Sequence, residues 1–210
     1  MNLGMSGLVF LVSGGGSGIG QAVTRQCLEE GASVVVAGRN TPEVMAFETE
    51  MKASVSSRCH FFQAELADPS QCEAAIVFVR DSFGRLDGLV NNAGANDNVG
   101  LETGDPLRFE ESLRQNLLHY YSLAHFALPM LKESHGSIVN ISSKVAVTGQ
   151  GGTSAYAAAK GAQLALTREW AAELLPYGIR VNAVVPAEVL TPLYEPVSYT
   201  HLTLPTIYSV

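Results

Sequence analysis

Residues 8–20 read LVFLVSGGGSGIG, and this stretch decides the fold. Its first part, residues 8–12, is a short apolar run typical of a strand buried in a parallel sheet. The glycines follow at once, and a helical pattern then runs from Gln21 to Glu30. Glycines let a backbone approach a phosphate closely, and a helix start offers free N–H groups. The stretch therefore predicts a strand, a pyrophosphate-binding loop and a helix, because a flexible linker would not be flanked directly by apolar elements.

The same alternation of apolar runs and helical patterns continues along the chain. Thr41-Pro42 and Asp68-Pro69 each place a capping residue before a first-turn proline, which supports two of the helix starts. Strict alternation of strands and helices predicts an α/β fold, a single-domain doubly wound parallel sheet of the Rossmann type. The expected strands are 8–12, 33–37, 60–65, 86–91, 137–142 and 180–185, and the expected helices are 18–30, 42–54, 69–83, 106–132 and 154–177.

Composition excludes several classes of function. The 210 residues carry a formal net charge of −7 without a basic stripe, which argues against a nucleic-acid partner. No apolar run is long enough for a membrane helix, and no Lys or Arg precedes Arg25, so a signal peptide is not indicated. Three cysteines without metal-ligand spacing indicate reduced thiols and a cytoplasmic protein, and the scattered histidines predict no metal site.

A second informative stretch is Ser154–Lys160, SAYAAAK, with Ser143 thirteen residues before Tyr156. Residues i and i+4 share one face of a helix, so the phenol of Tyr156 and the ammonium of Lys160 point into the same space. A nearby ammonium favours the phenolate and moves the pKa of the tyrosine toward neutral pH. The pattern suits proton transfer to or from an alcohol or carbonyl oxygen. Alone, it also fits a tyrosine packed under a lysine stem on an ordinary helix surface.

Together, Gly14-x-x-x-Gly18-x-Gly20, the NNAG of residues 91–94 and Tyr156-x-x-x-Lys160 resemble the short-chain dehydrogenase/reductase family, from about residue 7 to 194. The resemblance implies that Tyr156 is the general acid/base, that Lys160 lowers its pKa and that Ser143 orients the reacting oxygen. It also implies that Asn116 holds a proton-relay water, although a helix-surface position is the alternative. The cofactor-binding residues that it implies are Ser13, Gly14, Ser17, Gly18, Ile19, Gly20, Arg39, Glu65, Leu66, Asn92, Ala93, Gly94, Tyr156, Lys160, Pro186, Val189 and Thr191.

The end of the second expected strand bears on the choice between NAD and NADP. Relatives that prefer NAD place an acidic residue there to bind the ribose 2′-hydroxyl. This chain has Gly38 at that place, followed by Arg39, whose guanidinium can pair with a 2′-phosphate. However, Ser17 stands where many NADP enzymes carry a second basic residue. We expect NADP as the cofactor. Use of both NADP and NAD is one alternative, and an Arg39 side chain that only faces solvent is another.

Within the family, residues 91–97, 140–151 and 186–194 look most similar to bacterial L-fucose (aldose) dehydrogenases. That resemblance implies oxidation of the anomeric hydroxyl of a sugar to a lactone. A polyhydroxy substrate needs several polar partners, because a buried polar group without one costs about 1–3 kcal/mol. The candidates for substrate contacts are Ser143 and the loop residues Asn96, Asp97, Lys144, Gln150 and Glu188, and each of the loop residues also fits a solvent-facing position. A 3-oxoacyl or general carbonyl reductase is the alternative within the family.

The end of the chain departs from the family pattern. Residues 1–196 are expected to form the dehydrogenase domain, although members of the family usually continue for longer. Residues 197–210 contain no Asp, Glu, Lys or Arg and resemble nothing in the family, and we interpret them as foreign sequence joined to a truncated gene. A catalytically dead nucleotide-binding protein is therefore a third hypothesis. The long helices that relatives use for packing predict a homo-oligomer, either a dimer or a tetramer.

Overall fold

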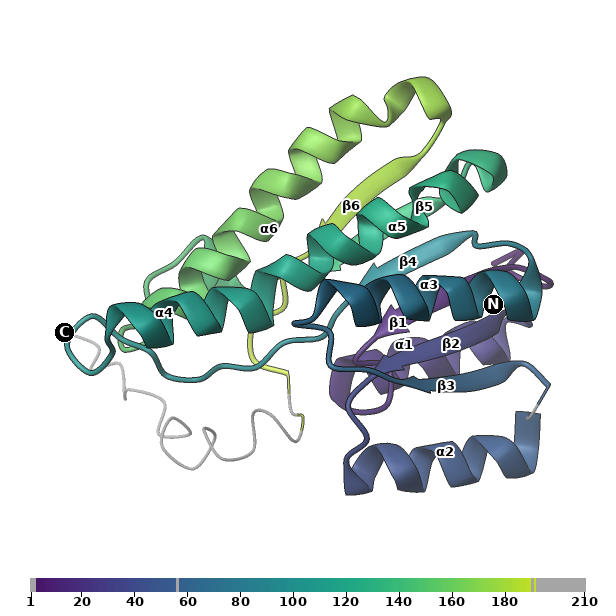
Figure 1. Cartoon of the computed structure of the whole chain (residues 1–210), viewed down its shortest axis with the longest axis horizontal. Coiled ribbons are helices and arrows are strands. Elements are labelled where there is room, and N and C mark those ends of the chain that lie inside the picture. Colours follow the sequence, from purple (N-terminus) through teal and green to yellow (C-terminus); the bar gives the residue numbers. More distant parts are fainter. Residues whose placement is uncertain (1–2, 56, 190, 192–210) are drawn as a thin grey trace, which may run out of the picture.

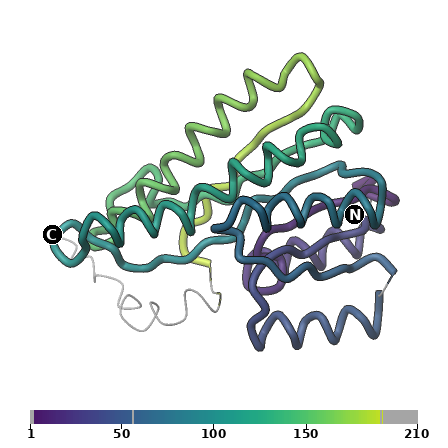
Figure 2. Tube along the Cα trace, in the orientation of Figure 1, coloured from purple at the N-terminus to yellow at the C-terminus, as the bar shows by residue number. Residues whose placement is uncertain are grey.

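The computed structural model describes residues 3–55, 57–189 and 191 of the chain (Figure 1). Its centre is a sheet of six parallel strands in the order β3-β2-β1-β4-β5-β6. The order reverses beside β1, where the chain returns from β3 to β4 and then continues to the opposite edge (Figure 2). The strands are β1 (Val9–Ser13), β2 (Ser33–Gly38), β3 (Cys59–Gln63), β4 (Gly88–Asn91), β5 (Ser137–Ile141) and β6 (Arg180–Val184).

Helices cover both faces of the sheet (Figure 1). The α-helices are α1 (Gly18–Glu29), α2 (Pro42–Val55), α3 (Pro69–Phe83), α4 (Pro106–Leu113), α5 (His119–Ser134) and α6 (Ser154–Glu173). A π-helical segment, η1 (Arg114–Leu118), joins α4 to α5, and the short 3₁₀ turns are η2 (Lys144–Ala146) and η3 (Leu175–Tyr177). Within the described residues, none of the helices is long and apolar enough to cross a membrane.

Local sequence explains where two of these helices begin. The carboxylate of Asp68 accepts a hydrogen bond of 2.9 Å from the backbone N–H of Ser70, and Pro69 occupies the first turn of α3. Asp105 accepts bonds from the N–H groups of Leu107 and Arg108 in the same way at the start of α4. Each cap satisfies N–H groups that have no partner inside the helix, so both helix starts are set by the sequence itself.

Alternation along the strands divides the apolar interior into two cores. One core packs Leu11 and Leu89 with side chains of α3, α5 and α6, Trp170 among them. The other packs Val12 and Val36 against α1 and α2. Successive strand residues point to opposite faces, so neighbours such as Leu11 and Val12 enter different cores. The central strands are buried on both faces, which is why they read as continuous apolar runs.

The predicted fold class is confirmed, and each expected strand lies within two residues of an observed one. The expected single helix at 106–132 is interrupted by η1, where one turn widens to the π form. The expected helix at 154–177 ends at Glu173 and is followed by η3. Leu190 and the tail predicted at 197–210 lie outside the described residues.

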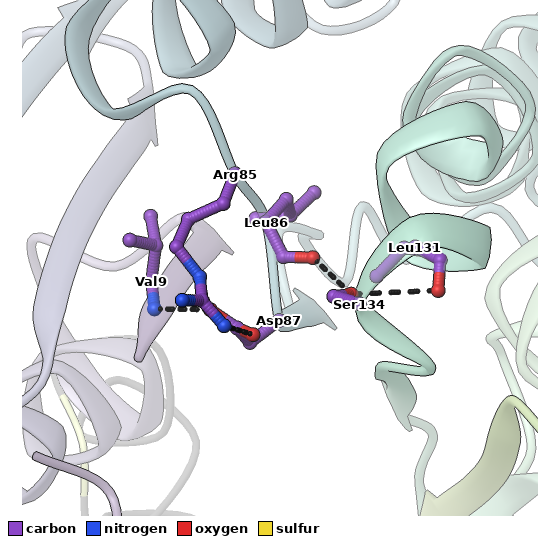
Figure 3. Close-up of polar contacts among 6 residues, drawn as sticks. All are labelled: Val9, Arg85, Leu86, Asp87, Leu131 and Ser134. Atoms are coloured by element: carbon purple, nitrogen blue, oxygen red, sulfur yellow. Dashed lines mark hydrogen bonds and ion pairs between the residues drawn. The ribbon is translucent and has the colours of Figure 1, made fainter. Parts of the chain in front are cut away.

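Polar contacts brace the amino ends of the central strands (Figure 3). The buried carboxylate of Asp87 accepts hydrogen bonds from the backbone N–H of Val9 at 2.8 Å and from the guanidinium of Arg85 at 2.6 and 2.9 Å. On the other side, the hydroxyl of Ser134 donates to the carbonyl of Leu86 at 2.6 Å. These bonds fix β1, the start of β4 and the end of α5 relative to one another, at the edge of the sheet opposite the glycine loop.

Candidate active site

The glycine loop follows β1 at the carboxyl end of the sheet, beside the point where the strand order reverses. Gly14 adopts a left-handed conformation with φ of 63° and donates its N–H to the carbonyl of Ala37 at 2.8 Å. A Cβ atom added to Gly20 would overlap the carbonyl oxygen of Gly14 and the side-chain amide of Asn92. The loop and the start of α1 are therefore packed so closely that only glycine fits at Gly20. Helix α1 begins at Gly18, and the first N–H groups of a helix have no partner within it and can bind an anion.

Asn92 ties the end of β4 to the glycine loop. Its side-chain amide nitrogen donates to the carbonyls of Ser13 at 3.0 Å and Gly14 at 3.2 Å. In return, the hydroxyl oxygen of Ser13 accepts bonds from the backbone N–H groups of Asn92 and Ala93. Ser13 is fully buried, so it braces the wall of the site and does not face the cavity.

A cavity of about 410 Å³ opens along these strand ends. It extends from the end of β2, through the glycine loop, to Tyr156 and Lys160 on α6. Many of the residues expected to bind a cofactor line it, namely Gly14, Ser17, Gly18, Ile19, Arg39, Glu65, Leu66, Asn92, Ala93, Gly94, Tyr156, Lys160 and Thr191. Of the other expected residues, Ser13 and Gly20 lie behind the wall. Pro186 and Val189 line a second, adjoining pocket that also reaches the glycine loop and Thr191.

Tyr156 lies in the first turn of α6, which contacts β5 and is tied to the loop after β4 by the bond from the N–H of Ala155 to the carbonyl of Val99. Burial raises the pKa of Tyr156, and a hydrogen bond with the hydroxyl of Ser143 opposes that rise. The ammonium nitrogen of Lys160 lies 5.5 Å from the centre of the Tyr156 ring. The expectation of a pKa moved toward neutral is therefore not met in this structure, because the effect of burial is the larger one.

Lys160 is almost fully buried one helical turn further on. Its ammonium donates to the carbonyl oxygen of Ile141 at 2.8 Å and to the hydroxyl oxygen of Tyr120 at 3.4 Å. Burial lowers the pKa of Lys160 to about 7. The neighbouring Ser142 donates its hydroxyl to the carbonyl of Lys160 at 2.8 Å and so anchors the helix, whereas Ser143 faces Tyr156.

Asn116 sits in the π segment and is completely buried. Its side-chain oxygen accepts the backbone N–H of Ala95 at 2.8 Å, and its side-chain nitrogen donates to the carbonyl of Ser112 at 3.1 Å. The backbone carbonyl of Asn116 accepts a bond of 2.7 Å from the side-chain nitrogen of Gln163. The bond from Ala95 holds the loop after β4 against the helix, and the bond from Gln163 ties this helix to α6. The relay role expected for Asn116 stays a prediction.

The residues expected to contact a substrate are not among those that line the cavity. Lys144 and Glu188, on the segments that follow β5 and β6, form an ion pair with each other. The side-chain oxygen of Asn96 accepts the backbone N–H of Asn98, and Gln150 is exposed. In this geometry the charges of Lys144 and Glu188 are partly satisfied by one another.

Sequence reasoning missed two parts of the cavity wall. Asn40, Thr41 and Val44 line it beside Arg39, and they were identifiable as the residues that follow the second strand. His119 also lines the cavity, on the first turn of α5. Its ring nitrogen Nε2 lies 3.0 Å from the carbonyl oxygen of Ala93. No local sequence signal marks His119, because its role depends on a strand end 26 residues away.

Comparison with known proteins identifies the family. Residues 8–201 match the short chain dehydrogenase family. The chain is 37% identical over 191 residues to L-fucose dehydrogenase of Rattus norvegicus, covering 90% of this chain and 69% of the relative. It is 33% identical to the 3-oxoacyl-acyl-carrier-protein reductase of Thermotoga maritima, covering 91% of this chain and 78% of that protein. A solved structure described as Cj0485 dehydrogenase superposes with a TM-score of 0.89 at 40% identity, covering 95% of this chain and 76% of that one.

The chain therefore belongs to the short-chain dehydrogenase family. It is an NAD(P)-dependent oxidoreductase that acts on CH–OH groups. The geometry fits such a cofactor, because the glycine loop packs too tightly for a side chain at Gly20 and offers N–H groups to the same cavity that reaches Lys160.

Proposed function

We propose that this protein oxidises the anomeric hydroxyl of an aldose such as L-fucose to the lactone. The observation that carries the proposal is the similarity to L-fucose dehydrogenases, which extends over 90% of the chain and includes the loops around the cavity. A second observation supports a polyhydroxy substrate. One carboxylate oxygen of Asp97 is buried without a hydrogen-bond partner among the described residues.

The loop that carries Asp97 is tied down at both ends. Ala95 donates its N–H to Asn116, and the carbonyl of Val99 accepts the N–H of Ala155, next to Tyr156. The loop therefore runs beside the catalytic tyrosine. A carboxylate oxygen left without a donor there suits a hydroxyl group of a sugar, because a buried acceptor without a partner is costly.

The residues of this chain take the following roles in the reaction. The nicotinamide, when bound, supplies the acceptor for the hydride that leaves the substrate carbon. Tyr156, as the phenolate, accepts the proton of the substrate hydroxyl, and Ser143 holds the oxygen to which that proton was attached. Lys160 stabilises the phenolate when it is charged. Asn116 keeps the loop after β4 in place and is proposed to hold a relay water.

We propose NADP as the preferred cofactor. Arg39 is exposed at the cavity edge, and its guanidinium makes no hydrogen bond or ion pair with the described residues. Gly38, in the place of an acidic residue, has φ of 154°, a conformation that L side chains rarely adopt. An aspartate at Gly38 would therefore be strained, whereas a free guanidinium suits a 2′-phosphate. The expected cytoplasmic location and the homo-oligomer remain part of the same proposal.

The purified full chain tests the function directly. With L-fucose and NADP⁺ we expect reduction of the nicotinamide, at least a hundredfold slower in Tyr156→Phe, which retains cofactor binding measured by fluorescence titration. The control is Tyr121→Phe, since Tyr121 is exposed on α5 and stacks on His125 outside the site. Arg39→Gln should raise the KM for NADP⁺ more than that for NAD⁺.

The alternative is a 3-oxoacyl or general carbonyl reductase, favoured by the similarity to the Thermotoga maritima enzyme. Oxidation of NADPH by a ketone or a 3-oxoacyl thioester, with no reaction of any aldose, would replace the sugar proposal with this one. Cofactor binding without either reaction would favour the dead nucleotide-binding protein.

A further inference from the structure

Lys160 is a buried ammonium without a carboxylate counter-ion. Its residue is 3% exposed, and within the described parts of the chain no Asp or Glu forms an ion pair with it. The titratable side chains that face it are Tyr156 on its own helix, and Tyr120 and His119 on α5. The positive charge of Lys160 therefore depends on neutral hydrogen-bond acceptors.

Two acceptors contact the ammonium, and they are linked to each other. The carbonyl oxygen of Ile141, at the end of β5, lies 2.8 Å from the Lys160 nitrogen, and the hydroxyl oxygen of Tyr120 lies 3.4 Å from it. The Tyr120 hydroxyl donates its own proton to the same Ile141 carbonyl at 2.9 Å. Because that proton is already used, the lone pairs of the Tyr120 oxygen remain available to Lys160. We name this pair, the Tyr120 hydroxyl and the Ile141 carbonyl, the ammonium seat.

The seat is held rigidly. Tyr120 is fully buried, on the first turn of α5 directly after the π segment. Gln163, on α6, donates its side-chain N–H at 2.7 Å to the backbone carbonyl of Asn116, in the π segment that directly precedes α5. His119 adds no competing positive charge, because a carbonyl accepts its Nε2–H and burial lowers its pKa to about 4.

The ammonium seat bears on two opposing effects at Tyr156 and Lys160. Tyr156 needs a positive neighbour to become a phenolate, yet burial favours the neutral amine of Lys160. Hydrogen-bond acceptors aimed at the ammonium favour the charged form and oppose the effect of burial. A phenylalanine at residue 120 would fill the same space and remove one of the two acceptors.

We propose that Tyr120 is a positioning residue for the catalytic pair, and that its hydroxyl, together with the Ile141 carbonyl, keeps Lys160 charged and directed toward Tyr156. The inference rests on the roles of Tyr156 and Lys160 in the proposed function, but not on the identity of the substrate. It concerns a residue that neither the motifs nor the spacing of the sequence indicate.

The direct test is a titration of Lys160 in the full chain without substrate. The ¹³Cε resonances of lysines are followed by NMR between pH 5 and 11, with Lys160 assigned from Lys160→Arg. In Tyr120→Phe we expect the midpoint for Lys160 to fall by at least half a pH unit. Tyr121→Phe, which removes an exposed hydroxyl from the next residue on the same helix, should titrate like the original chain. An unchanged or raised midpoint in Tyr120→Phe overturns the proposal.

A second variant covers the case in which Tyr120→Phe does not fold. 3-Fluorotyrosine at residue 120 keeps the ring and the hydroxyl but makes the oxygen a weaker acceptor, so the Lys160 midpoint should fall by a smaller amount. No fall in that variant also overturns the proposal. Because both titrations need no turnover, a failed activity assay would count against the proposed function and leave this result intact.

The pH profile of turnover supplies a readout that a merely structural role would not move. With whichever alcohol the chain oxidises, the ascending limb of kcat/KM against pH should move to higher pH in Tyr120→Phe. Lys160 then loses its proton at lower pH, and Tyr156 consequently ionises at higher pH. A uniform loss of rate with an unmoved limb would instead show damage to packing and contradict the proposal.

Discussion

The carboxylate of Asp87 accepts the backbone N–H of Val9 at 2.8 Å, although the two residues are 78 positions apart (Figure 3). Asp87→Ala removes this acceptor and leaves a buried N–H without a partner. We expect the free energy of unfolding to fall by about 2 kcal/mol. Urea denaturation measures it.

The control for this prediction is Arg85→Ala. The Arg85 guanidinium is half exposed and contacts the same carboxylate. Arg85→Ala should therefore lower the free energy of unfolding by less than Asp87→Ala does. Turnover per folded molecule should be unchanged in both variants, because the contact lies at the edge of the sheet away from the cavity. An equal loss of stability in both would show that the ion pair, and not the bond to Val9, is the important contact.

Gly20→Ala should weaken cofactor binding at least tenfold. The added methyl group would overlap the carbonyl of Gly14 and the amide of Asn92, so the glycine loop must move away from α1. Fluorescence titration with NADP⁺ and NAD⁺ measures the change. Gly161→Ala is the matched control. Gly161 lies in the middle of α6, and a Cβ atom added there meets no other atom within 4 Å. Unaltered affinity in Gly20→Ala would contradict the tight packing of the loop.

His119 should make the protein less stable in weak acid. Burial lowers its pKa from 6.5 to about 4, so between these values the unfolded chain binds a proton that the folded chain does not. The contribution of the neutral His119 side chain to the free energy of unfolding is complete above pH 6.5. As the pH falls to about 4, up to about 3 kcal/mol of stability is lost. Urea denaturation between pH 7 and 4.5 should give a steeper decline for the original chain than for His119→Gln, which keeps a donor for the Ala93 carbonyl. Parallel curves would refute this prediction.

The three cysteines should not react with a disulfide reagent while the protein is folded. Burial raises the pKa of Cys27 to about 11 and that of Cys59 and Cys72 to about 12. At pH 8 almost none of each thiol is the reactive thiolate. We expect no colour with Ellman's reagent at pH 8, and three equivalents after denaturation in urea. One equivalent released quickly from the folded chain would indicate an accessible cysteine.

The sequence predicts the fold well because the strands are buried on both faces. In a strand such as β2, Val34, Val35 and Val36 are all buried, so successive residues are apolar. A strand with one exposed face would alternate between apolar and polar residues instead. Capping aspartates and first-turn prolines then set the helix starts. The glycine loop and the Tyr156–Lys160 spacing predict which strand ends meet at the cavity, because parallel strands bring their carboxyl ends to one edge.

Contacts between distant residues account for what the sequence did not predict. The seat around Lys160 joins residues 19 to 40 positions apart, and each of them reads locally as ordinary helix or strand. The ion pair between Lys144 and Glu188 spans 44 positions, so spacing along the chain does not reveal that the two charges partly satisfy one another. The pKa of Tyr156 depends on how deeply its ring is buried, which spacing alone does not reveal.

The π segment at Arg114–Leu118 determines how this helix would respond to the deletion of a residue. A π turn holds one residue more than an α turn, so removing a single residue there would restore a regular helix. The shortened turn would still complete one circuit of the helix axis, so the side chains that follow would keep their directions. Tyr120 and His119 would continue to face Lys160 and Ala93. The π segment is therefore the place where this helix accommodates an extra residue without turning α5 away from the site.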